Sequence, residues 1–119
     1  MTKILAVDDS ASMRQMVTFT LKGAGYDVKD AADGQQGLQL AKSEQFDVIV
    51  SDVNMPVMDG IAMITEIRKL PQYRRTPILM LTTESSADKK MAGKQAGATG
   101  WIVKPFNPEQ LLKTIARVV

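Results

Sequence analysis

Several polar residues that could carry out chemistry stand directly after short apolar runs of the chain. They are Asp8, Asp9, Asp52, Asn54, Thr82 and Lys104. Carboxylates can bind a divalent cation or attack phosphorus, while a hydroxyl and an ammonium can hold the oxygens of an anionic group. The sequence contains no cysteine and no histidine, which excludes thiol catalysis, thiolate ligands and imidazole chemistry. Any reaction must therefore use carboxylates, hydroxyls and lysine.

The apolar runs alternate with helical patterns along the whole chain. The runs are Ile4–Val7, Tyr26–Val28, Val48–Val50, Ile78–Leu81 and Trp101–Val103. Each is short and continuous, which is typical of strands buried on both faces, and Tyr26–Val28 is the weakest. Helices are expected over Met13–Ala24 with Gly25 as a stop, over Gly34–Lys42, Met58–Leu70 and Ala87–Ala96, and from Asn107-Pro108 onward. In the last helix, the residues expected to face inward are Leu111, Leu112, Ile115 and Val119.

Strict alternation of strand and helix predicts one α/β domain over residues 1–119, a doubly wound (βα)5 fold with a five-stranded parallel sheet. Parallel strands need long crossovers, so helices cover both faces of the sheet. Strand order 2-1-3-4-5 belongs to the flavodoxin-like class of such folds and is not itself a result of the pattern. In these folds the carboxyl ends of the strands meet at one edge, where ligands bind.

At that edge, Asp8 and Asp9 would meet Asp52 if the first and third strands are neighbours. Three carboxylates so close would raise one another's proton affinity, and a divalent cation resolves the conflict. Magnesium suits the site because it takes oxygen ligands and keeps several waters. One carboxylate could then attack phosphorus, with Thr82 and Lys104 holding the phosphoryl group. A lysine facing three aspartates also balances their charge.

Each of these residues also has an ordinary structural explanation. The Asp8-Asp9 pair with Ser10 could simply cap the first helix, and Asp52 alone could be a loop residue. Thr82 could be part of a turn at the end of a strand, and Lys104-Pro105 is a common turn signal. Four polar signals at the ends of four different strands favour a shared site.

The residues resemble those of the response-regulator receiver domain over essentially the whole chain. The matching motifs are Val7-Asp8-Asp9-Ser10, the run Ser51–Gly60, Leu81-Thr82-Thr83-Glu84, Gly97-Ala98 and Lys104-Pro105-Phe106. The resemblance implies that Asp52 accepts a phosphoryl group from a phosphohistidine of a kinase. It also implies slow hydrolysis of the resulting aspartyl phosphate, so we expect a signalling switch rather than an enzyme.

The same resemblance implies roles for the neighbouring residues. Direct Mg²⁺ ligands would be Asp9, Asp52 and the main-chain carbonyl of Asn54, with Asp8 acting through a metal-bound water. Thr82 and Lys104 would contact the phosphoryl group. The Lys104-Pro105 bond would be cis, although only about 5 to 6% of X-Pro bonds are.

As a domain with no output module, the chain resembles the stand-alone chemotaxis regulators, which bind the flagellar motor switch protein when phosphorylated. The resemblance implies that protein, and a phosphatase, as partners. Other stand-alone receivers act as phosphate relays or sinks, or regulate another partner, and these alternatives stay open. Trp101 departs from the Tyr or Phe usual at the family's switch position, where the aromatic ring turns toward Thr82. It could equally be ordinary edge-strand packing. A group of lysines could be a solvated face or could meet an acidic partner: Lys89, Lys90, Lys94 and Lys113.

Charge, apolar runs and single residues argue against other classes of protein. A net charge of +2 is too mild for nucleic-acid binding, and no apolar run suits a signal peptide or a membrane span, so we expect a cytoplasmic monomer. A phosphatase of the haloacid dehalogenase type would need a second aspartate at position 10, which is Ser, and a cap insertion. A flavin-binding module would bring its phosphate against Asp8 and Asp9, which would repel it.

Overall fold

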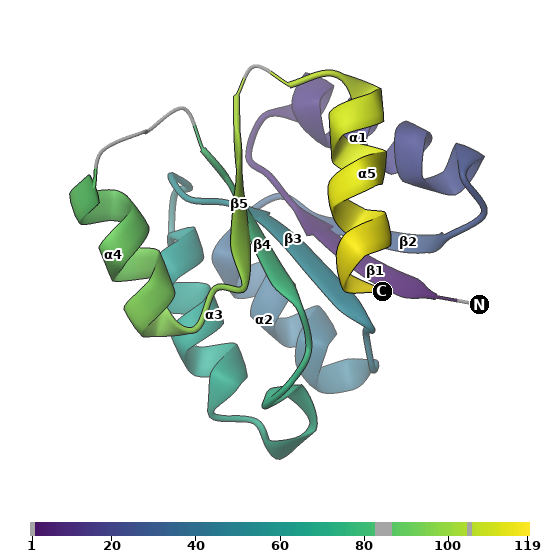
Figure 1. Ribbon diagram of the computed structural model, residues 1–119. Helices are drawn as coiled ribbons and strands as arrows, with labels where there is room; N and C mark the ends of the chain where they lie inside the picture. The colour runs from purple at the N-terminus through teal and green to yellow at the C-terminus, as the bar shows by residue number, and fades with distance from the viewer. Residues whose placement is uncertain (1, 83–86, 105) are drawn as a thin grey trace.

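The computed structural model describes residues 2–82, 87–104 and 106–119, which form a parallel sheet with helices on both faces (Figure 1). The strands are β1 (Lys3–Val7), β2 (Asp27–Ala31), β3 (Val48–Asp52), β4 (Ile78–Thr82) and β5 (Gly100–Val103). The helices are α1 (Ala11–Gly23), α2 (Gly34–Ser43), α3 (Gly60–Arg68), α4 (Ala87–Ala96) and α5 (Pro108–Val118), with a short 3₁₀ helix, η1 (Pro71–Tyr73). The strand order is β2-β1-β3-β4-β5 and every pairing is parallel, which confirms the predicted fold.

Two apolar layers hold the sheet between the helices. On one face the sheet packs against α1 and α5, and on the other against α2 and α3, with α4 beside α3 (Figure 1). In β3, Ile49 belongs to the α2 and α3 side, while Val48 and Val50 belong to the α1 and α5 side. Because both faces of the strand are covered, its sequence is apolar without alternation.

Capping residues determine where the helices begin and end. The Ser10 side chain accepts a hydrogen bond from Met13 N and starts α1. Gly25 ends α1 in a left-handed conformation, φ +95°, as the sequence predicts. Asp59 caps α3 by accepting a hydrogen bond from Ala62 N, so α3 begins two residues later than the expected Met58.

Two other boundaries and the placement of one side chain differ from expectation. The second strand is Asp27–Ala31 rather than Tyr26–Val28. It lies at an edge of the sheet, where polar residues are exposed, so a search for apolar runs does not find its full length. The expected helix to Leu70 ends at Arg68 and is followed by η1. Val119 is 57% exposed, so its inward placement was wrong: it follows the last residue of α5 and is the last residue of the sequence.

The strand register brings the predicted polar residues to one edge. Val7 pairs with Ser51, Asp52 with Leu81, and Thr82 with Val103. The residues that follow these positions therefore leave the sheet side by side, at the carboxyl ends of neighbouring strands. No membrane-crossing helix occurs among the described residues, since every helix there is too short or too polar for one.

Candidate functional site

Three carboxylates gather at this edge of the sheet. One oxygen each of Asp8, Asp9 and Asp52 lies within 4.8 Å of the others. Asp8 is 2% exposed and Asp52 is 8% exposed, whereas Asp9 is open to solvent. The cluster is thus a shallow acidic site with two buried members and one accessible member.

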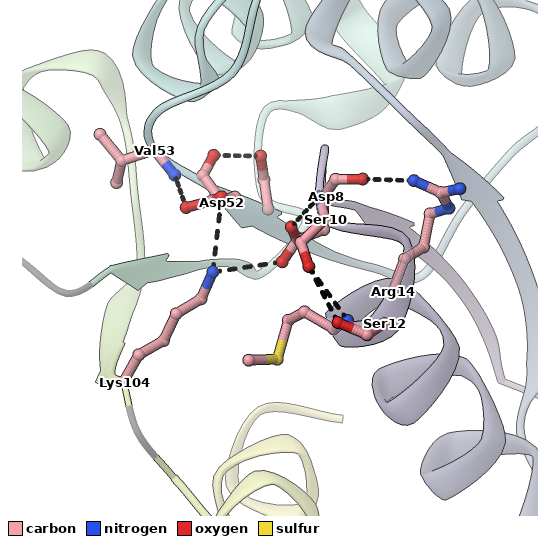
Figure 2. Close-up of polar contacts among 9 residues, drawn as sticks. Asp8, Ser10, Ser12, Arg14, Asp52, Val53 and Lys104 are labelled. Atoms are coloured by element: carbon pink, nitrogen blue, oxygen red, sulfur yellow. Dashed lines mark hydrogen bonds and ion pairs between the residues drawn. The ribbon is translucent and has the colours of Figure 1, made fainter.

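The ammonium of Lys104 lies between the two buried carboxylates. Its Nζ is 3.3 Å from Asp8 Oδ2 and 3.4 Å from Asp52 Oδ2. Figure 2 shows the ammonium directed at both carboxylates. The Lys104 side chain is only 12% exposed, and its main-chain N–H donates to the Thr82 carbonyl, which joins it to the end of β4. Three ionised carboxylates and one ammonium leave two negative charges.

The two residues that flank Asp52 in the chain hold it by hydrogen bonds. The amide of Val53 donates to Asp52 Oδ1 at 2.8 Å, and the Ser51 hydroxyl donates to the Asp52 carbonyl at 2.8 Å. A Cβ on Gly60 would lie 2.1 Å from the Asp52 carbonyl oxygen, so only glycine fits where α3 begins. The Val53 amide therefore fixes the Asp52 carboxylate, while the Ser51 hydroxyl and the start of α3 fix the Asp52 main-chain carbonyl.

Burial raises the pKa of the Asp52 carboxyl above its ordinary value. The positive charge of Lys104 acts in the opposite direction, and the negative charge of Asp8 raises the pKa further. The net effect is a raised pKa. The positive charge that the protein itself places near Asp52 therefore does not fully offset the cost of ionising this buried carboxyl. A cation at the cluster would supply that charge.

The other predicted site residues lie around this cluster with different degrees of burial. Thr82, 1% exposed, ends β4 beside Lys104, and Asn54 is exposed two residues after β3. Trp101 is partly buried on the α2 and α3 side of the sheet. A Cβ on Gly93 of α4 would lie 2.4 Å from Cη2 of the Trp101 indole, so the ring lies directly over that glycine. Pro105, expected to follow a cis bond, lies outside the described residues.

Two neighbours of the site were missed by the sequence reasoning. Arg14 donates from Nη1 to the Asp8 carbonyl at 2.7 Å and from Nε to Asp30 Oδ2 at 3.0 Å. No local pattern marks an arginine in the first turn of a helix for this task. Gly60 could have been found, because it directly follows a capping aspartate in the motif that begins at Ser51.

The donor set fits a magnesium ion. All the clustered side-chain atoms are carboxylate oxygens, their net charge calls for a divalent cation, and exposed Asp9 leaves room for metal-bound water. Asp8, Asp9 and Asp52 would hold the ion.

Comparison with known proteins assigns the chain to a family. Residues 4–116 match the response regulator receiver domain. The chain belongs to this family. It is 61% identical to chemotaxis protein CheY4 of Vibrio cholerae, whose structure matches with a TM-score of 0.97 over 100% of this chain and 99% of that one.

More distant receivers carry other names. Chemotaxis protein CheY-3 of Vibrio cholerae is 37% identical over 98% of this chain and 90% of its own length. A probable transcriptional regulator, ycf27 of Porphyridium aerugineum, is 40% identical over 98% of this chain, which spans only 48% of that protein. The receiver domain of sensor histidine kinase PA1611 from Pseudomonas aeruginosa PAO1, solved with magnesium coordinated in its active-site cleft, is 32% identical with a TM-score of 0.91, over 98% of this chain and 96% of that one.

The raised pKa of Asp52 predicts how stability depends on pH. Between the ordinary pKa and the raised one, the folded state binds more protons than the unfolded state, so wild-type stability falls as pH rises through that interval. In a metal chelator, Asp52→Asn should therefore be more stable than the wild type at neutral pH, and its advantage should shrink toward acid pH. Urea unfolding across this pH range measures the difference.

Asp27→Asn is the matched control, because Asp27 is exposed at the other end of the sheet and its change should stay within about 0.5 kcal/mol. Saturating Mg²⁺ should stabilise the wild type but not Asp52→Asn. A chelator-treated Asp52→Asn protein less stable than wild type at neutral pH would contradict this account of the cluster.

Proposed function

We propose that Asp52 accepts a phosphoryl group from the phosphohistidine of a histidine kinase in the presence of Mg²⁺, and that the phosphorylated protein then binds a different partner. The observation that carries this proposal is the Lys104 ammonium, placed 3.3 and 3.4 Å from Asp8 and Asp52 within a cluster of three carboxylates. Family membership and the magnesium in the PA1611 receiver support it.

In the proposed reaction, a carboxylate oxygen of Asp52 forms a bond to phosphorus while the bond from phosphorus to the imidazole nitrogen breaks. The leaving imidazole takes up a proton from solvent. A bound Mg²⁺ would neutralise charge on the carboxylates and on the phosphoryl oxygens. Lys104 would move from two carboxylates to share a phosphoryl oxygen, and Thr82 lies beside it at the end of β4.

The chemistry favours a switch over a turnover enzyme. The acyl phosphate on Asp52 is itself the signal, and water reaching it through the open side at Asp9 would remove it slowly. The position where a haloacid dehalogenase phosphatase has its second aspartate is occupied by Ser10, whose hydroxyl already accepts the capping hydrogen bond of α1. No acid or base for rapid turnover lies there.

Acetyl phosphate tests the proposed acceptor. With Mg²⁺ and acetyl phosphate, the intact mass of the wild type should rise by one phosphoryl group, and Asp52→Asn should not change. Excess chelator should abolish the gain because the two negative charges that Lys104 leaves unbalanced would repel the phosphodonor. No mass gain in the wild type, or an equal gain in Asp52→Asn, would overturn the proposal.

For the output, we propose the flagellar motor switch, since CheY4 and CheY-3 are chemotaxis proteins. The surface formed by α4, β5 and α5 suits an amphipathic acidic peptide. It exposes Met91 (60%) and Val103 (43%), and hollows of about 330 and 470 Å³ flank Trp101. The cations that line these hollows are Lys90, Lys94, Lys113 and Arg117.

Binding of a motor-switch peptide tests this output. Phosphorylation of Asp52 should tighten binding at least tenfold, about 1.4 kcal/mol, measured by fluorescence anisotropy. Lys113→Glu should weaken binding of the phosphorylated protein, whereas Lys42→Glu on α2, far from this surface, should not. If phosphorylation leaves the affinity unchanged, the motor assignment fails, and a phosphate relay or sink, or another partner, takes its place.

A further inference from the structure

Arg14 connects three parts of the acidic edge. It lies in the first turns of α1 and donates from Nη1 to the Asp8 carbonyl at 2.7 Å (Figure 2). Its Nε donates to Asp30 Oδ2 on β2 at 3.0 Å. Its side chain is 22% exposed and that of Asp30 is 48% exposed. The guanidinium thus reaches back along the loop that carries two of the three clustered carboxylates.

The carbonyl that accepts from Arg14 belongs to the peptide group between Asp8 and Asp9. The main-chain amide of Asp8 donates to the Ala31 carbonyl at 3.1 Å. Both main-chain polar groups of Asp8, its amide and its carbonyl, are therefore held by hydrogen bonds. The Asp8 carboxylate is also held, since Oδ1 accepts from the Ser10 amide at 2.9 Å and Oδ2 faces Lys104.

Asp9 has no such support of its own. Within the part of the chain that the structure describes, its carboxylate makes no hydrogen bond or ion pair, and it is exposed. Its position beside Asp8 and Asp52 therefore depends on the main chain. Before a cation arrives, repulsion from the other two carboxylates pushes Asp9 outward, and the contact from Arg14 to the preceding carbonyl resists that movement.

Asp30 gives Arg14 a fixed geometry and a balanced charge. A guanidinium with no acidic partner would be drawn to the carboxylates of the cluster, where it would compete with a cation. Paired with Asp30, it reaches the carbonyl and leaves the carboxylate oxygens available.

We propose that Arg14, anchored by Asp30, is a positioning residue for divalent cation binding: it fixes the Asp8-Asp9 peptide so that the exposed Asp9 carboxylate stays beside Asp8 and Asp52. This inference rests on the proposed function, because it concerns the same site. It assigns Arg14 no contact with the phosphoryl group.

Calorimetric titration with MgCl₂ tests the proposal on Arg14→Gln. Removing a positive charge near the acidic cluster should by itself tighten Mg²⁺ binding, whereas loss of positioning should weaken it. We expect Mg²⁺ binding about tenfold weaker than wild type, which corresponds to about 1.4 kcal/mol. The matched control is Arg75→Gln, an exposed arginine beyond η1 at the other end of the sheet, which should leave the affinity unchanged.

Arg14→Lys serves as the second variant and keeps the charge. Its single ammonium cannot reproduce the two-armed contact, so its affinity should fall between those of the wild type and Arg14→Gln. Asp30→Asn should weaken Mg²⁺ binding less in Arg14→Gln than in the wild type, because Asp30 acts mainly through Arg14. Urea unfolding in chelator and circular dichroism confirm that each titrated variant is folded.

The outcomes separate this inference from the proposed function. If the wild type does not bind Mg²⁺, the proposed function fails. If the wild type binds Mg²⁺ and Arg14→Gln binds it equally well or more tightly, only the positioning role is overturned. Fully additive losses in the double variant would overturn the anchoring of Arg14 by Asp30.

Discussion

Mutual repulsion among Asp8, Asp9 and Asp52 is the interaction that the whole carboxyl edge of the sheet must accommodate. Their oxygens lie within 4.8 Å of one another, and Lys104 offsets part of their charge from the end of β5. Lys104 can do this only because β4 lies between β3 and β5, with its end hydrogen-bonded to the lysine main chain. The strand order therefore determines the electrostatics of the site.

The rigid core below the site keeps the charged groups together despite their repulsion. Strands buried on both faces fix where each strand ends, and the Val53 amide and the Ser51 hydroxyl fix Asp52 from its own strand. The start of α3 approaches so closely that position 60 must be glycine. Two negative charges remain unbalanced. A divalent cation would balance them and would allow an anionic phosphoryl group to approach Asp52.

Continuous apolar runs made β1, β3, β4 and β5 predictable. The polar residue after each of these runs indicated the shared site. Features that depend on tertiary contacts could not be predicted in this way. The polar edge strand β2 lacks an apolar run of its own length, and Arg14 serves the site through a main-chain carbonyl that sequence spacing does not reveal. The unexpected Trp101 is accommodated by Gly93 on a different element, a match visible only once α4 lies against β5.

The most direct test of this account is a crystal structure of the protein with Mg²⁺ and the phosphoryl analogue beryllium trifluoride. We expect beryllium bonded to an Asp52 carboxylate oxygen, the cation among Asp8, Asp9 and Asp52, and the Lys104 ammonium against a fluorine. Analogue bound at another residue, or no analogue at Asp52 while the cation is present, would contradict the assignment of Asp52 as phosphoacceptor.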